Sequence, residues 1–185
     1  MIENFSNLII DIEKGDEVDA FEAAKAIAYN SLSKAELEQL SHVVTTGIQV
    51  YNKEAAIYSL YCIENKSFAL SALIDVLSSL QYHERVRGRA AEGIGLIKPS
   101  RRFKCRVRAE EILLKSLNDY SPTVRFWSCY AVGELKMKSA LPILNELHSN
   151  DVSLCPGWWY ISQEAEDAIA KINDREWKDR IPINL

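Results

Sequence analysis

Residues 121–150, SPTVRFWSCYAVGELKMKSALPILNELHSN, have the pattern of two antiparallel helices joined by a tight turn. Ser121 is a residue type that caps helix N-termini, and Pro122 suits a first helical position, where no N–H is needed. Small and apolar residues then follow at helical spacing until residues 136–139 interrupt them. Pro142 fits the first turn of a second helix. These features predict a helical hairpin.

The first helix of this hairpin recurs along the chain. With residues 124–135 (VRFWSCYAVGEL) as a twelve-residue template, residues 86–97 (VRGRAAEGIGLI) align without a gap. Both copies begin with Val-Arg, have small residues at the fifth, sixth and eighth places, and have Gly at the tenth. Weaker copies start at residues 19, 52 and 161, so the starts are spaced by 33, 34, 38 and 37 residues. Such spacing predicts stacked helical hairpins that bury their apolar faces against one another.

The rest of the chain also has helical periodicity, and no segment of useful length alternates as a β-strand does. A capping box of Ser33 and Glu36 predicts a helix that extends to about residue 50, and Asn52 is the expected cap of the next one. We expect further helices near residues 3–13, 17–30, 53–64, 67–80, 83–97, 104–118 and 161–173. The sequence therefore predicts one all-α domain over residues 1–185, with a capping helix in residues 1–15 and a C-terminal cap in residues 157–185.

The sequences VRGRAAEGIGLI, VRFWSCYAVGEL and SALPILNEL resemble HEAT repeats, and most closely the bacterial HEAT-like type that also occurs in phycobilisome lyase-related proteins. The resemblance is most specific over residues 83–149 and extends to residue 172. It implies a short right-handed α-solenoid whose second helices line a concave face. It also implies that Arg87 or Arg125, the Arg of each Val-Arg pair, meets an Asp in the turn between repeats, for which Asp119 is the candidate. It implies no lyase activity, because HEAT repeats are scaffolds with many functions.

Composition narrows the classes of protein to consider. The chain has few Gly and Pro residues, 7 and 5, and a formal charge of −4. Its N-terminus lacks the basic region of a signal peptide, and no apolar run approaches the length of a membrane span. Four cysteines form no CxxC pair and suit a reducing compartment: Cys62, Cys105, Cys129 and Cys155. We expect a soluble, cytoplasmic protein with no membrane-bound part.

Charge is unevenly distributed along the chain. Residues 81–115 have a net charge of +6, whereas residues 1–80 have −7 and residues 116–185 have −3. The positive charge comes from Arg85, Arg87, Arg89, Lys98, Arg101, Arg102, Lys104, Arg106 and Arg108. Such a cluster is a solvated face neutralised by nearby acids such as Glu110 and Glu111, a surface for an acidic protein, or a surface for nucleic acid. The negative charge of the whole chain disfavours nucleic acid.

A second unusual stretch is residues 156–160, PGWWY, which precedes the last predicted helix. Three adjacent aromatic residues cannot all point inward with helical period. They either anchor a partner, as Trp and Tyr do at interface hot spots, or fold back with Trp177 as a cap. Segments similar to GWW are familiar at the end of bacterial HEAT-like chains, which favours a structural role for at least one Trp. Trp127 is expected to pack between repeats, and its replacement by Ala would cost about 3–5 kcal/mol if it is buried.

Residue patterns for catalysis are weak. His42, His83 and His148 are scattered over three repeats without the spacing of a metal site. Cys105 lies between Lys104 and Arg106, and cationic neighbours can activate a thiol, but no base is placed beside it. The chain has no Gly-rich phosphate loop. We therefore predict no enzymatic activity, no catalytic residues, no cofactor and no metal site.

The sequence predicts a non-enzymatic, protein-binding solenoid, which is an adaptor or an inhibitor such as a toxin-immunity protein. The expected partner is a protein with an acidic surface that docks on a basic concave face. The predicted contact residues are Arg89, Arg101, Arg102, Lys104, Arg106, Arg108, Trp158 and Trp159. The alternative is a HEAT-like protein that binds the nucleic-acid backbone, whose affinity would fall steeply with salt.

Overall fold

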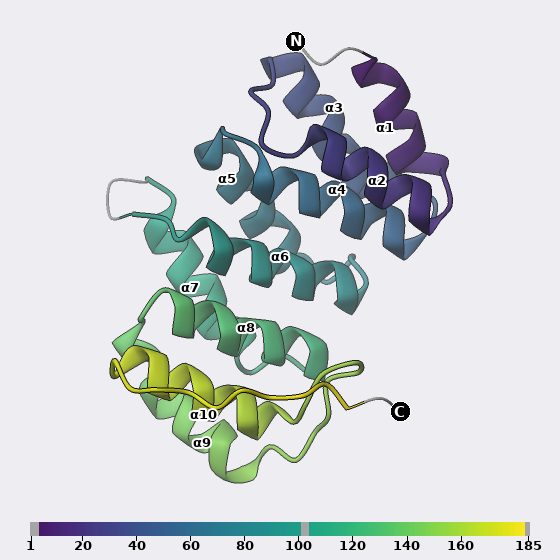
Figure 1. Cartoon of the computed structure of the whole chain (residues 1–185). Coiled ribbons are helices and arrows are strands. Elements are labelled where there is room, and N and C mark those ends of the chain that lie inside the picture. Colours follow the sequence, from purple (N-terminus) through teal and green to yellow (C-terminus); the bar gives the residue numbers. More distant parts are fainter. Residues whose placement is uncertain (1–3, 101–103, 184–185) are drawn as a thin grey trace.

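The structure, a computed structural model, describes residues 4–100 and 104–183 (Figure 1). In this part of the chain all regular elements are helical, apart from one isolated β-bridge between Leu154 and Tyr160. The helices are α1 (Phe5–Lys14), α2 (Glu17–Ile27), α3 (Lys34–Thr46), α4 (Val50–Cys62), α5 (Lys66–Ser78), α6 (Glu84–Ile97), α7 (Arg106–Ser116), α8 (Pro122–Glu134), the short 3-10 helix η1 (Lys138–Ala140), α9 (Leu141–Asn150) and α10 (Ile161–Ile172). The predicted all-α class is confirmed.

The helices form a solenoid of two layers. Helices α2, α4, α6, α8 and α10, which carry the five template copies, stack one against the next, from the dark N-terminal end to the yellow end of Figure 1. Helices α5, α7 and α9 form the other layer. Each of these packs mainly on the stacked helix that follows it in the chain, so α9 packs on α10. The two helices and the turn predicted within residues 121–150 are present, but α9 makes few close contacts with α8.

Small residues allow the stacked helices to approach closely. A Cβ atom added to Gly95 in α6 would lie 2.8 Å from the Cα atom of Ala131 in α8, and one added to Gly133 would lie 2.9 Å from the Cα atom of Ala168 in α10. In both cases the tenth place of one template copy meets the eighth place of the next. Between α4 and α6 the sizes are exchanged, because Tyr61 at the tenth place packs on Gly93 at the eighth.

These close approaches place the stacked layer on the inside of the curve. Helices α5, α7 and α9 contact one another much less than α4, α6, α8 and α10 do. In a solenoid, the layer with the smaller spacing between helices is the concave one. The expectation that the second helices line the concave face is therefore wrong for this chain, because its small residues lie on the first helices.

The Arg–Asp interaction implied by the HEAT resemblance is confirmed. Arg87 is fully buried, and its two terminal nitrogens donate to the two carboxylate oxygens of Asp119, at 2.5 and 3.2 Å. Its guanidinium also lies 5.2 Å from the centre of the Tyr120 ring. Arg125 occupies the same place in the next repeat and donates to Asp151 at 2.7 Å and to the carbonyl oxygen of Asp119 at 2.8 Å. A contact between the Arg of the Val-Arg pair and an Asp therefore recurs from one repeat to the next.

The N-terminal part of the solenoid has a capping box at the start of α3 and a helix, α1, that packs over the first repeat. The predicted capping box is present, since Ser33 Oγ accepts from the N–H of Glu36 and the Glu36 carboxylate accepts from the N–H of Ser33. Helix α1 packs on α2 and α4 and buries Phe5 and Ile12. Helix α1 therefore packs over the first repeat, and its role as an N-terminal cap stays a prediction.

Two predicted caps differ from the structure. Ser121 stands at the N-cap position of α8, but its hydroxyl caps nothing, and the Asp119 carboxylate instead accepts from the N–H of Ser121 at 2.9 Å. Asn52 is not the N-cap residue of α4, which begins at Val50, but its third residue. Its side-chain oxygen accepts from the N–H of Gln49 at 2.9 Å, and its side-chain nitrogen donates to the carbonyl oxygen of Gly15 at 3.1 Å. Asn52 therefore caps this helix from inside its first turn, whereas the buried Ser121 hydroxyl has no hydrogen-bond partner among the described residues.

Replacing Gly95 with alanine should destabilise the protein by about 1 kcal/mol, because the clash with the backbone of Ala131 costs about 1–3 kcal/mol and outweighs the gain in helix propensity. Urea denaturation followed by circular dichroism measures the difference. Gly88→Ala is the matched control. Its added Cβ would meet only side-chain atoms of Thr123 and Trp127 and a carbonyl oxygen at 3.3 Å, so its midpoint should change less. Equal losses in both variants would contradict the proposed close approach of α6 and α8.

Candidate functional site

The concave layer has a groove that crosses α6, α8 and α10. It is formed by side chains at the fourth and seventh places of successive template copies, which lie one helical turn apart on the same face. These side chains are Arg89 and Glu92 on α6, Trp127 and Tyr130 on α8, and Glu164 and Asp167 on α10. We call this set the inner groove. It consists of two adjoining hollows of about 340 and 380 Å³, and Trp127 and Trp158 line both of them.

Aromatic rings form the middle of the inner groove. The buried ring of Phe126 lies 5.3 Å from Trp127, 6.0 Å from Trp158 and 5.6 Å from Trp159. Trp127 lies 5.1 Å from Trp158 in an edge-to-face arrangement and is only half-buried. Such packing is favourable for aromatic pairs and keeps the rings in place. Trp158 and Trp159 therefore fold back onto α8, whereas Tyr160 stays largely exposed.

A tight turn directs these rings toward α8. The N–H of Trp158 donates to the carbonyl oxygen of Cys155 at 2.9 Å, and the N–H of Cys155 donates to the carbonyl oxygen of Trp159 at 3.1 Å. Pro156 and Gly157 occupy the central places of this turn, and Gly157 has a φ of 79°. That is the geometry of a type II turn, which favours Pro and then Gly. The Pro-Gly pair thus explains why two adjacent Trp residues can both reach the α8 side.

The α10 end of the inner groove is acidic. Glu164 is almost fully buried and accepts a hydrogen bond from the indole N–H of Trp159 at 2.9 Å. Burial raises the pKa of Glu164 to about 7, while Lys171 opposes this shift and Asp167 adds to it. Burial also raises the pKa of Glu92, against the effect of Arg89 at 2.6 Å. A groove with buried carboxyl groups and exposed aromatic faces is suited to a cationic ligand.

The predicted basic cluster is divided between the two layers. Arg85 and Arg89 lie on α6 beside the inner groove, whereas Lys104 precedes α7 and Arg106 and Arg108 lie on α7 in the convex layer. Arg101 and Arg102 lie outside the described residues. The described bases therefore do not form one concave surface, in contrast to the expectation. The reason is that the sequence cluster spans α6 and α7, which belong to different layers.

Most described members of the cluster have a carboxylate partner. The pairs are Arg85 with Glu54 at 2.7 Å, Arg89 with Glu92 at 2.6 Å, Lys98 with Glu134 at 2.7 Å, Arg106 with Glu110 at 2.5 Å and Arg108 with Asp75 at 3.1 Å. Arg87 is the buried structural residue described above. These pairs agree with a largely neutralised face. Partner binding by Lys104, Arg106 and Arg108 stays a prediction.

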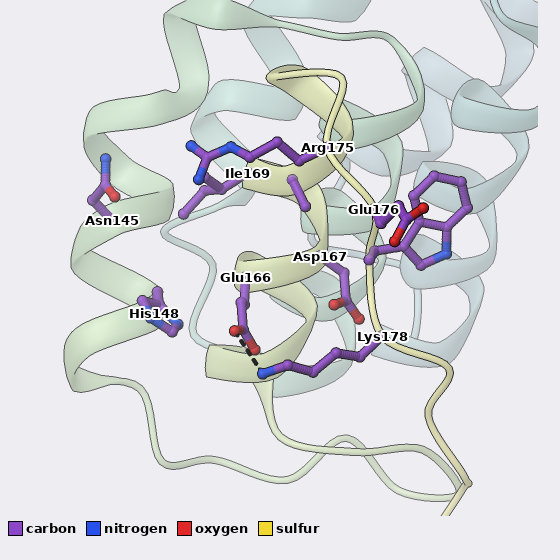
Figure 2. A pocket seen from close by; sticks show the side chains of 10 residues that line it. Asn145, His148, Glu166, Asp167, Ile169, Arg175, Glu176 and Lys178 are labelled. Atoms are coloured by element: carbon purple, nitrogen blue, oxygen red, sulfur yellow. Dashed lines mark hydrogen bonds and ion pairs between the residues drawn. The ribbon is translucent and has the colours of Figure 1, made fainter.

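The last described segment, residues 174–183, crosses α10 without regular structure (Figure 1). Figure 2 shows the hollow on its α9 side, where Lys178 reaches from the segment to Glu166 on α10 while Asn145 and His148 project from α9. The side chain of Trp177 lies over the Lys171 ammonium at 5.1 Å and lines this hollow and the α10 end of the inner groove. This segment therefore lies along the α10 end of the inner groove, over Asp167, and borders the hollow that remains.

The structure adds little to the weak patterns for catalysis. Over residues 4–100 and 104–183, no three His, Cys, Asp or Glu residues are arranged to hold a metal ion. All four cysteines are free thiols, and Cys105 precedes α7 in a partly buried position. None of the described helices is long and apolar enough to cross a membrane.

Comparisons with known proteins agree with this architecture. A family profile of HEAT repeats matches residues 70–155. This part of the chain is similar to HEAT repeats. The match covers most of α5 and all of α6 to α9, which is the part where the Val-Arg copies are clearest, and it does not distinguish the phycobilisome lyase-related type. A search of curated proteins found no match.

Two solved structures resemble the HEAT-like solenoid. One is a designed armadillo repeat protein in complex with the peptide (KR)4, with 20% identity over 91% of this chain and 82% of that chain and a TM-score of 0.52. The other is a computationally designed armadillo repeat protein for modular peptide recognition, with the same identity and coverage and a TM-score of 0.49. The first likeness supports the α-solenoid fold and, at this identity, nothing beyond the fold.

Several groove residues were missed by the sequence reasoning. Glu92, Tyr130, Glu164 and Asp167 were not predicted as contact residues, although Arg89 and Trp158 were. A signal was available in the template alignment. The fifth, eighth and twelfth places stay small or aliphatic from copy to copy, whereas the fourth and seventh places change from Arg and Glu to Trp and Tyr and then to Glu and Asp. The packing of the solenoid does not constrain the residue type at the fourth and seventh places, so these places are free to form a binding surface.

Proposed function

We propose that this HEAT-like chain is a non-enzymatic protein-binding module that holds a segment of its partner in the inner groove. The observation that carries the proposal is the pair of half-buried aromatic side chains, Trp127 and Tyr130, in the middle of a groove that crosses three helices. Aromatic residues in partly desolvated hollows supply most of the binding energy at many protein interfaces.

The charges at the two ends of the inner groove give it a direction. Arg85 and Arg89 border the α6 end, and Glu164 and Asp167 border the α10 end. The two arginines are paired with Glu54 and Glu92, so acidic residues of the partner, which the sequence led us to expect, would compete with these carboxylates. The carboxyl groups at the other end favour a basic residue. Complementary charges of this kind fix the orientation of a bound segment more than they raise its affinity.

An adaptor and an inhibitor both fit this mode of binding. An inhibitor such as a toxin-immunity protein would cover a functional surface of its partner, and the small size of the chain and its uneven charge support that role. A cytoplasmic location is part of the same proposal and rests on the free thiols.

Binding to the nucleic-acid backbone is the second candidate, and the structure gives it less support. Five of the described bases are paired with carboxylates, which reduces the positive charge that phosphates would meet. The chain is acidic as a whole. A nucleic-acid complex would lose affinity steeply as salt is raised, because bound phosphates release counterions.

A selection for binding fragments tests the proposed function. A displayed library of protein fragments from the source organism is selected on the wild-type protein, and the affinity of enriched fragments is measured by fluorescence anisotropy. The double variant Trp127→Ala, Tyr130→Ala should weaken these fragments about 100-fold or more, as expected when two hot-spot residues are lost. Thermal unfolding of each variant shows whether it is folded. If the double variant is not folded, the single variant Tyr130→Ser takes its place and should also weaken binding.

The matched control reverses two charges on the convex layer, Lys104→Glu and Arg108→Glu. It should leave the affinity of the fragments unchanged. If this control abolishes binding while the aromatic variants do not, the basic surface of α7 is the contact site and the inner groove is not. Fragments that tolerate both changes would overturn both locations.

A further inference from the structure

The arginine of the last described segment is held unusually firmly for an exposed stretch of chain. The side chain of Arg180 is only 9% exposed. Its Nε donates to Asp167 at 2.5 Å, and its Nη2 donates to Asp167 and to Glu166, both at 2.8 Å, and to the carbonyl oxygen of Gln163 at 2.9 Å. All three acceptors belong to the first turns of α10. Planar guanidinium groups favour this kind of paired contact with carboxylates.

The rest of the segment is attached by few contacts. Asn173 to Asp179 are exposed, and Ile181 is 87% exposed, so the segment contributes no buried apolar side chain. Its start is held by the pair of Asp174 with Lys136 and by the N–H of Arg175, which donates to the carbonyl oxygen of Ala170 at 2.9 Å. Beyond it, besides Arg180, the contacts are the Lys171 ammonium over the Trp177 ring, the pair of Lys178 with Glu166 at 2.9 Å and the N–H of Ile183, which donates to the carbonyl oxygen of Trp158 at 3.0 Å. An extended chain held by polar contacts and one deep side chain resembles a bound peptide more than a part of the core.

The acidic site exists independently of the segment. Asp167 stands at the seventh place of the α10 template copy, which faces the inner groove in every copy from α6 onward. Without Arg180, the buried Asp167 carboxylate would lose its paired cation, whereas Glu166 would keep its pair with Lys178. Buried carboxylates are costly unless a cation pairs with them. The α10 end therefore requires a positively charged occupant.

We infer that residues 177–183 are an internal occupant of the inner groove, and that the groove takes from its partner an extended segment with an arginine that displaces Arg180. This inference rests on the proposed function and specifies the chemistry of the partner. The choice of an arginine-bearing peptide follows from charge complementarity and from the bidentate contact that the chain itself makes at this site. Trp127 and Tyr130 remain half-exposed beside the segment, so a partner gains contacts there that the internal occupant does not use.

The attachment of the segment to α10 sets how strongly it competes. A tethered ligand acts at an effective concentration on the order of 1 mM. A free peptide that binds the open site with a Kd of about 10 µM would therefore bind the wild-type protein about 100-fold more weakly. The segment thus lowers the apparent affinity of every competing peptide, and only a partner with additional contacts binds well enough to displace it.

A peptide titration on the complete chain tests this inference. The probe is a fluorescent peptide with the sequence of residues 175–183, REWKDRIPI. It should bind the variant Arg180→Ala about 100-fold more tightly than the wild type. A peptide in which the arginine before Ile-Pro-Ile is replaced by alanine should lose this binding, and so should the double variant Arg180→Ala, Asp167→Asn.

Two further variants keep the test decisive. Arg180→Lys retains the charge without the fork of donors and should give intermediate affinity if Arg180→Ala is poorly folded. Lys136→Ala removes the exposed pair with Asp174, at the start of the segment and outside residues 177–183, and should behave as the wild type does. Equal binding to the wild type and to Arg180→Ala, or binding that is indifferent to the arginine of the peptide, would overturn the inference.

The two proposals fail separately. If selected fragments depend on Trp127 and Tyr130 but bind Arg180→Ala and the wild type equally, the inner groove is a binding site and the internal occupant is not. If the arginine peptide binds Arg180→Ala while the aromatic variants affect no selected fragment, the acidic site exists but the proposed function of the whole groove is wrong.

Discussion

Replacing Arg87 with alanine is expected to lower the free energy of unfolding by about 3–5 kcal/mol, which is typical when one partner of a buried ion pair is removed. The side chain of Arg87 is fully buried and that of Asp119 is 10% exposed. The variant would therefore leave a carboxylate in a largely dry turn, where only the N–H of Ser121 still donates to it. Urea denaturation followed by circular dichroism at 222 nm gives the difference.

The matched control for this prediction is Arg108→Ala. Its pair with Asp75 has the same chemistry, but the two side chains are 59% and 66% exposed. Exposed pairs contribute about 0–1 kcal/mol, so the control should unfold almost as the wild type does. Comparable losses in the two variants would show that burial of the Arg87 pair is not what stabilises the junction between α6 and α8.

Replacing Glu164 with glutamine is expected to stabilise the protein by about 3 kcal/mol near pH 8 and to change it little near pH 4. Burial raises the pKa of Glu164 from its ordinary 4.5 to about 7, so the folded state holds a proton that the unfolded state releases. The wild type therefore loses stability as the pH rises from about 4.5 to about 7. Glutamine is neutral throughout, and its amide oxygen can still accept from Trp159.

Denaturation of both proteins at several pH values between 4 and 8 measures this effect as a difference of free energies, from which titrations common to both cancel. Glu146→Gln, on an exposed part of α9, is the control and should show no such divergence. A difference between Glu164→Gln and the wild type that stays constant with pH would mean that the pKa of Glu164 is the same in the folded and the unfolded protein, which would contradict the raised pKa.

Local signals made much of the fold predictable. The bounds of most helices follow from period, caps and breakers, each of which acts within a few residues. The pair of Arg87 with Asp119 was also expected, because it comes with the repeat itself. The capping box of Ser33 and Glu36 is local in the same sense. The position of the Asn52 cap was not predicted correctly, since α4 begins two residues earlier and Asn52 caps it as the third helical residue.

The arrangement of the site depends on distances that no local pattern contains. Which layer lies on the inside of the curve is decided by contacts such as Gly95 with Ala131, 36 residues apart. For the same reason, Arg89 and Arg106 looked like members of one basic surface although they belong to opposite layers. Arg180 gave no signal at all, because its partners on α10 are recognised only when the path of the segment is known.

The exchange of sizes between α4 and α6 has a consequence for how the chain can be lengthened or recombined. From α6 onward each joint is a glycine facing an alanine, so a duplicated copy of the α8 unit could be inserted after α8 and would meet the same surfaces. The contact between α4 and α6 is different, because the ring of Tyr61 fills the space that a side chain at Gly93 would occupy. A module moved across that joint would set Tyr61 against an alanine. The solenoid is therefore modular on one side of α6 and specific on the other, which restricts the positions at which repeats can be gained by duplication.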